Sequence, residues 1–259
     1  MRKRAVRSGL LLLGMVSAAL APATAGATPV SGPHETLDNR LSTTRPNTAN
    51  GFSFTGTYHA AGDRSADPPY MRRMTFYDPP GLRLDTSVPE RCSAGDLELA
   101  MFGAAACPAG SRLGGGTGTS RFAGRFRSTL KLDVFNNTNE EIILAESPGF
   151  ATIARGRIRR DGAIEWASPT CFPAIQPPGC PVGDVLQLQS SITVPPYTKS
   201  SHGVVRSYST TPPTCPRSRH WTTPVRLWWA DGSVDTVVTR QPCKRPRHHH
   251  HGRRSMHRR

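Results

Sequence analysis

Carboxylates are the side chains of this 259-residue chain best suited to acid–base chemistry. Hydrolysis of a glycosidic bond needs two of them about 5 to 10 Å apart, one as the acid and one as the base or nucleophile. The candidates are Asp133, Glu140, Glu141, Glu146 and Glu165. Glu146 and Glu165 fall in expected strands, where alternation can bring both to one face. Because 18 acids in one chain always offer such pairs, we favour a solvated face, with a glycan-active hydrolase as the alternative.

Other motifs of catalysis and cofactor binding are missing from the sequence. It has no Gly-x-Ser-x-Gly and no His-Glu-x-x-His. The glycine-rich segment 114–118 is not followed by the Lys-Ser/Thr of a phosphate loop, so we interpret it as the start of a strand against which another backbone packs. Residues 231–235 lack the downstream acid of a calcium loop. The sequence therefore assigns no catalytic, cofactor-binding or metal-ligating residue.

Histidines and tryptophans give weaker indications. His59, His202 and His220 are isolated from one another in the sequence, which favours surface or core histidines over catalytic ones. Trp228 and Trp229 must face opposite sides of a regular strand, so we expect one in the core and the other half-exposed. A half-exposed tryptophan can stack on a sugar or a peptide.

The N-terminus has the pattern of an export signal. A basic segment precedes an apolar run from Gly9 to Ala21, and small residues follow at the spacing that signal peptidase requires. This pattern predicts a signal peptide over 1–25, with cleavage after Ala25 or Ala27. The run is too short for a transmembrane anchor, so we expect a secreted mature chain.

Six cysteines lie in the mature chain, and an even number in an exported protein indicates disulfides. Fifteen connectivities are open. The spacings of 15, 9 and 28 residues make sequential pairing the simplest. We therefore expect the pairs Cys92–Cys107, Cys171–Cys180 and Cys215–Cys243. A metal site is disfavoured because no Cys-x-x-Cys occurs and no histidine lies at ligand spacing from a cysteine.

The net charge of +15 belongs mainly to the two ends of the chain. Residues 244–259 hold seven Lys and Arg and no acid, whereas residues 8–243 hold 22 basic residues against 18 acids. The domain surface is thus only mildly basic and predicts no specific nucleic-acid recognition. We expect the His/Arg-rich tail 244–259 to be disordered because it is almost free of apolar side chains. Its expected partners are anionic cell-wall polymers or other polyanions, although a solvated tail without a role is the alternative.

Period-two alternation through residues 41–243 predicts an all-β domain, an antiparallel β-sandwich of about ten strands. Asp161-Gly162 and Asp231-Gly232 predict hairpins with type I′ turns. Ser93 as N-cap and Asp96 three residues later predict one short helix, inside the first disulfide loop and ended by Gly103. The polar segment 26–40 is expected to be a flexible linker. The main strands are expected at 51–58, 73–77, 82–84, 126–135, 141–146, 151–160, 163–168, 185–194, 204–209, 225–230 and 234–240.

The first cysteine loop also carries a family resemblance. It has the sequence Cys-Ser-Ala-Gly-Asp-Leu from Cys92, then Cys-Pro-Ala-Gly-Ser-Arg from Cys107, and the glycine-rich segment 114–118 follows. With residues 41–51 and 208–216, this motif resembles a group of uncharacterised exported actinobacterial proteins. The resemblance implies a disulfide-bonded β fold at the exterior of a Gram-positive cell, and it carries over no catalytic residue. We therefore expect a non-enzymatic extracellular or cell-surface interaction module without a cofactor.

Overall fold

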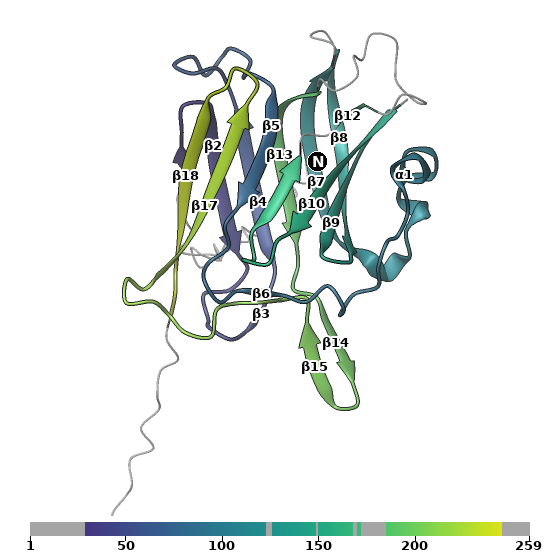
Figure 1. The fold of residues 1–259 in the computed structure, drawn as a ribbon, viewed down its shortest axis with the longest axis vertical. Coiled ribbons are helices and arrows are strands. Elements are labelled where there is room, and N and C mark those ends of the chain that lie inside the picture. The colour runs from purple at the N-terminus through teal and green to yellow at the C-terminus, as the bar shows by residue number, and fades with distance from the viewer. Residues whose placement is uncertain (1–28, 123–125, 149, 168–169, 172–184, 245–259) are drawn as a thin grey trace, which may run out of the picture.

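The computed structural model describes residues 29–122, 126–148, 150–167, 170–171 and 185–244 (Figure 1). The expected signal peptide, Cys180 and residues 245–259 of the tail lie outside these ranges. Within them, no helix is long and apolar enough to cross a membrane.

The domain is built on one sheet of thirteen strands, and all of its pairings are antiparallel. The all-β antiparallel class is confirmed, with one short α-helix among the residues that the structure describes. In spatial order the sheet consists of β1 (Val30–Ser31), β2 (Glu35–Leu41), β4 (Phe52–Tyr58), β13 (Val185–Val194), β7 (Arg112–Phe122), β8 (Phe126–Asn137), β9 (Glu140–Ser147), β10 (Phe150–Ile158), β11 (Ile164–Ala167), β5 (Met71–Phe76), β17 (His220–Trp229) and β18 (Val234–Pro242), with β12 (Thr170–Cys171) paired to β10.

Smaller elements lie outside this sheet. Three short strands form a second sheet in the order β3 (Ala49–Asn50), β16 (Ser209–Thr210) and β6 (Arg83–Leu84). A separate hairpin of β14 (Thr198–Ser201) and β15 (Val204–Ser207) projects from the end of the domain that carries β3 and β6 (Figure 1).

The large sheet curls back on itself, so that β18 contacts β1 and β2. We call the contact of β2 with β18 the seam. At one end of the seam, the Gln241 side-chain amide accepts from the Leu41 N–H and donates to the Leu41 carbonyl. The Lys244 N–H also donates to the Thr44 carbonyl. A side-chain amide thus takes the place of ladder hydrogen bonds there, and the sheet encloses a core.

The expectation of a flexible linker at 26–40 is wrong for its last residues, because strand β2 begins at Glu35. Residues 35–41 alternate regularly between buried and half-buried positions. Leu37 and Leu41 are buried, but so are the polar side chains of Glu35 and Asn39. The strand has the period of two that the fold requires, yet half of its inward positions are polar, which is why composition suggested a linker.

The helix α1 (Asp96–Phe102) covers the outer face of β8, β9 and β10. Leu99 packs there with Ile142 and Leu144. The expected end at Gly103 is confirmed by its φ of 60°. The expected N-cap is wrong, because the N-cap is Gly95, in extended geometry, and it makes no side-chain capping bond. A 3₁₀ turn (Gly103–Ala106) continues the helix, and another (Ala109–Ser111) leads into β7.

Two of the three expected disulfides are confirmed. Cys92–Cys107 closes the loop that carries α1, and Cys215–Cys243 ties the approach to β17 to the end of β18. The third expected pair, Cys171–Cys180, lies outside the described residues because Cys180 does.

Both expected Asp-Gly hairpins are present, joining β10 to β11 and β17 to β18. The expected type I′ turns are wrong, because Gly162 and Gly232 have positive φ while the aspartates before them do not. Each loop instead places three residues between a hydrogen-bonded pair, a type I turn followed by a left-handed glycine. The aspartate side chain accepts from the backbone N–H two residues on, which favours this geometry.

The glycine-rich segment forms β7, and the expectation that another backbone packs against it is confirmed. A Cβ at Gly114 would overlap the carbonyl oxygen of Thr193, and one at Gly116 would overlap that of Ser191. Both acceptors lie on β13. The glycines therefore permit a backbone approach that no side chain would allow.

Candidate ligand-binding cavity

The sequence-predicted pair Glu146 and Glu165 is not brought together. Glu146 is opposite Ala151 on β10, and Glu165 is opposite Arg157, six positions further along that strand. At about 3.3 Å per residue, the separation is about 20 Å along the strand direction alone. Such a pair cannot flank one glycosidic bond.

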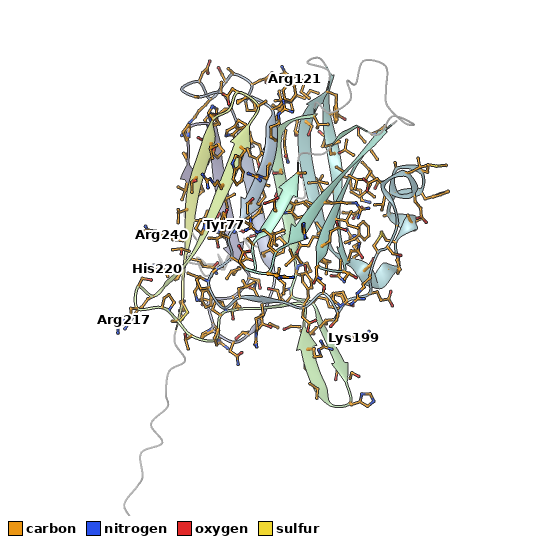
Figure 2. The ribbon with its side chains drawn as sticks, in the orientation of Figure 1. Tyr77, Arg121, Lys199, Arg217, His220 and Arg240 are labelled. Carbon is orange, nitrogen blue, oxygen red and sulfur yellow. A yellow bond between two sulfur atoms is a disulfide. The ribbon has the colours of Figure 1, made fainter. Side chains whose placement is uncertain are left out.

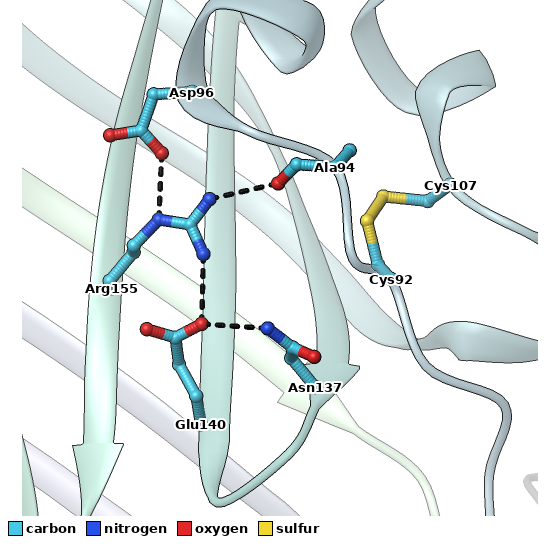
Figure 3. Close-up of polar contacts among 7 residues, drawn as sticks. All are labelled: Cys92, Ala94, Asp96, Cys107, Asn137, Glu140 and Arg155. Carbon is cyan, nitrogen blue, oxygen red and sulfur yellow. Dashed lines mark hydrogen bonds and ion pairs between the residues drawn. A yellow bond between two sulfur atoms is a disulfide. The ribbon is translucent and has the colours of Figure 1, made fainter.

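Two further candidate acids hold the fold together through ion pairs. The Glu140 carboxylate accepts from Arg155, whose guanidinium also binds Asp96 and the Ala94 carbonyl (Figure 3). This fork ties the start of α1 to β9 and β10. Asp133 similarly lies 2.6 Å from Arg112 and 2.7 Å from Lys131. Both acids are therefore paired with cations.

The candidate site is a cavity of about 120 Å³ inside the curled sheet. Alternation along the strands supplies its wall, because inward positions of β4, β5, β8, β9, β10, β11 and β13 all reach it. Most of the lining is apolar. It includes Phe52, Phe54, Met74, Phe76, Leu130, Leu132, Ile143, Ala145, Ala154, Trp166 and Ile192.

The titratable residues of the lining are Asp78 and Glu141, and we call these two acids, together with Tyr208, the acid cluster. Asp78 and Glu141 line the cavity, and the Tyr208 hydroxyl donates to Glu141 Oε1 at 2.5 Å. Glu141 and Tyr208 are each 1% exposed. Glu141 is the fifth sequence candidate, and it is the one that the fold brings beside a second carboxylate.

The acid cluster has acceptors in excess of donors. Among the described residues, no hydrogen-bond donor reaches the Asp78 carboxyl, and no Lys or Arg forms an ion pair with Asp78 or Glu141. Burial, followed by the charge of Glu141, raises the pKa of Asp78 to about 7. Burial also raises the pKa of Glu141 to about 7, against the opposing effect of the Tyr208 hydrogen bond. Both carboxyls thus carry a proton more readily than surface acids do.

A second polar group lies at the seam, and we call His34, Glu35 and Asp235 the seam cluster. His34 Nδ1 is 2.6 Å from Asp235 Oδ2, and the Trp229 indole donates to the same oxygen at 2.8 Å. Glu35 is 0% exposed, and neither of its carboxyl oxygens has a hydrogen-bond donor. Burial, with the neighbouring Asp235 carboxylate, raises the pKa of Glu35 to about 8, against the opposing effect of the nearby His34 backbone N–H.

No protein-family model, curated protein or solved structure matches this chain. The function therefore has to be argued from the geometry of the two clusters and the cavity.

The structure also places the tryptophans and histidines that the sequence singled out. Trp229 is buried and Trp228 is half-buried beneath the Arg73 and Arg226 guanidinium groups, as the alternation predicted. His59 is buried with its Nδ1 2.9 Å from the Ala60 carbonyl oxygen. The other two expected histidines, His202 and His220, are exposed.

Of the six residues in the two clusters, only Glu141 is a candidate for chemistry from the sequence. Asp78 precedes Pro79, a pattern typical of a turn that ends a strand, but it lies two residues after the inward-facing Phe76 and reaches the same cavity. His34 and Glu35 were assigned to the linker. The signal that could have found them is the alternation of Glu35 with Leu37, which marks a buried carboxylate on a strand.

Proposed function

We propose that the protein is an extracellular, non-enzymatic binding protein whose interior cavity holds a small molecule with an apolar body and a cationic amine head. The observation that carries this proposal is the Asp78 carboxyl, which faces an apolar cavity without a protein donor beside a second acid, Glu141. Asp78 is half-buried and Glu141 is fully buried, and polar groups removed from water are ordinarily satisfied by hydrogen bonds. A ligand that brings a positive charge and hydrogen-bond donors would satisfy both carboxyls at once.

The size of the cavity limits the ligand. Its volume of about 120 Å³ is close to the roughly 150 Å³ that holds a benzene molecule in an engineered apolar cavity. It is well below the roughly 300 to 1,000 Å³ of pockets that take drug-sized ligands. We therefore propose a ligand, or a ligand end group, of one ring or a short chain. Two sugar units on either side of a scissile bond would not fit, which favours binding over glycan hydrolysis.

Export and family membership are part of the proposal. The two disulfides support an extracellular location, since such bonds persist in oxidising compartments. Membership in the group of exported actinobacterial proteins is supported by the cysteine loop, in which a short helix precedes a glycine-rich strand, β7. The expected signal peptide fits the same location.

The basic tail remains a proposed second contact, with polyanions such as anionic wall polymers. The folded domain adds charge where the described chain ends, because Arg217, Arg219, Arg240 and Lys244 are exposed there. None of the four forms an ion pair with a described residue. Figure 2 shows Arg217 and Arg240 with His220 on this side of the domain.

The cavity proposal is tested by calorimetric titration of three ring compounds: benzylamine, benzyl alcohol and benzoate. The protein is expected to bind benzylamine at least tenfold more tightly than benzyl alcohol, since a hydrogen bond to a charged group contributes about 1.5 to 3 kcal/mol. Benzoate should not bind, because it would add a third carboxylate to the acid cluster.

Two variants distinguish the contribution of the acid cluster to binding from that of the cavity space. Asp78→Asn should lower benzylamine affinity to that of benzyl alcohol and leave benzyl alcohol unaffected. Ala154→Leu, which fills the cavity from β10, should abolish binding of both. Equal affinity for benzylamine in the parent and in Asp78→Asn would overturn the proposed role of the acid cluster.

A further inference from the structure

We propose that the seam cluster of His34, Glu35 and Asp235 is a binding site for a divalent metal ion, with Zn²⁺ as the preferred ion. One ligand atom from each residue lies within 4.8 Å of the other two. All three side chains are buried. The site is separate from the cavity, whose lining includes none of the three.

The carboxyl of Glu35 is the independent indication of a missing cation. It is 0% exposed, it has no hydrogen-bond donor, and it faces the second carboxylate of Asp235. Among the described residues, no Lys or Arg pairs with either acid. Two buried carboxylates in contact need a positive charge between them, which is supplied either by a proton, shared between the carboxyls or carried by the His34 imidazole paired with Asp235, or by a metal ion.

The donor set fits Zn²⁺. One imidazole nitrogen and two carboxylate oxygens are ordinary ligands of this ion at about 2.0 to 2.2 Å, with a water molecule as the usual fourth ligand. Tetrahedral ligands at that distance lie about 3.3 Å apart. The His34–Asp235 contact would therefore lengthen from 2.6 Å by several tenths of an ångström, a change that rotation of either side chain can provide.

Neighbouring groups hold these ligands in place. The Trp229 indole donates to Asp235 Oδ2, and its ring lies 5.2 Å from that of His34. Trp229 is thus a positioning residue of the kind that orients metal ligands. Gly32 lies against the Glu35 carboxyl, where a Cβ would overlap Oε1.

The consequence of metal binding is closure of the sheet. His34 directly precedes β2, Glu35 is its first residue, and Asp235 lies at the start of β18. The ion would join the two strands at this end of the seam, as the Gln241 amide does at the other. Metal binding should therefore stabilise the folded chain.

The test uses the full chain with the five tail histidines, 248–251 and 257, replaced by alanine, so that the tail does not bind the ion. Equilibrium dialysis against Zn²⁺ with metal analysis should find one ion per chain. Glu35→Gln and Asp235→Asn should each weaken Zn²⁺ binding by at least about tenfold, the effect that loss even of an outer-shell partner produces. Glu165→Gln, at a half-buried acid on β11 outside the seam cluster, is the matched control and should bind as the parent does.

A second measurement needs no substitution in the cluster and so does not depend on the variants folding. Co²⁺ added to the parent should give the visible absorption of a four-coordinate site, and Zn²⁺ should displace it. Failure of the parent to bind either ion, or binding by Glu35→Gln as tight as by the parent, would overturn the proposal and leave a bound proton as the positive charge of the seam cluster.

Discussion

Replacement of Glu141 by glutamine is expected to flatten the pH dependence of stability. Burial raises the pKa of Glu141 from 4.5 to about 7 in the folded chain. A carboxyl whose pKa is higher in the folded than in the unfolded state stabilises the fold while it is protonated. This contribution is fully present below pH 4.5 and is lost as the pH rises to about 7. At about 1.4 kcal/mol per pH unit, the loss amounts to about 3 kcal/mol for this one group.

Glutamine keeps the acceptor oxygen for the Tyr208 hydroxyl but does not titrate. Between pH 4.5 and 8, the parent should therefore lose about 3 kcal/mol more unfolding free energy than Glu141→Gln does. Asp78 adds to this difference between the parent and the variant. Loss of the Glu141 charge removes one of the two causes that raise the pKa of Asp78, so Asp78 also contributes less pH dependence in Glu141→Gln.

The assay is urea unfolding with the disulfides intact, followed by tryptophan fluorescence at pH 4.5, 6, 7 and 8. Glu165→Gln serves as the control for the loss of one half-buried acid outside the cavity and should follow the parent curve. Parallel curves for the parent and Glu141→Gln would refute the argument, since they would show that Glu141 ionises in the folded chain as it does in water.

Three further outcomes are expected. Gln241→Ala removes two hydrogen bonds to the Leu41 backbone and should lower the unfolding free energy by about 1 to 3 kcal/mol, measured by urea titration. Gly116→Ala places a methyl group on the Ser191 carbonyl and should cost about 1 to 3 kcal/mol in the same assay; an unchanged midpoint would contradict the close backbone approach. Replacing the six arginines of residues 245–259 with glutamine should weaken binding to anionic liposomes and remove most of its salt dependence, which for the parent should have a log–log slope of about −0.7 to −0.9 per phosphate neutralised. Equal retention of both forms at low salt would show that the tail does not contribute.

The fold was predictable wherever apolar residues alternate. The strand expected at 185–194 is β13 without any change of limits, and the segment 51–58 contains β4. Strand β2 escaped prediction because Glu35 and Asn39 occupy inward positions that a core strand normally fills with apolar side chains. Local patterns were also insufficient for the caps and turns, since Ser93 and both Asp-Gly pairs fit more than one backbone geometry.

The two clusters were less predictable because their members are far apart in the sequence. His34 and Asp235 are separated by 201 residues, and Glu141 and Tyr208 by 67. No spacing rule connects such residues. Only the closure of the sheet brings the first pair together, and that closure depends on the complete order of thirteen strands.

The central claim is that the cavity inside the sheet holds the ligand, and methyl NMR during titration with benzylamine tests it most directly. Strand β9 supplies a built-in comparison, because Ile143 lines the cavity while its neighbour Leu144 packs on the outer face beneath α1. Leu132 and Ile153 form a second such pair on β8 and β10. We predict saturable shifts of the Ile143 and Leu132 methyl signals with little change at Leu144 and Ile153. Shifts of equal size on both faces, or none at a saturating concentration of benzylamine, would contradict the account.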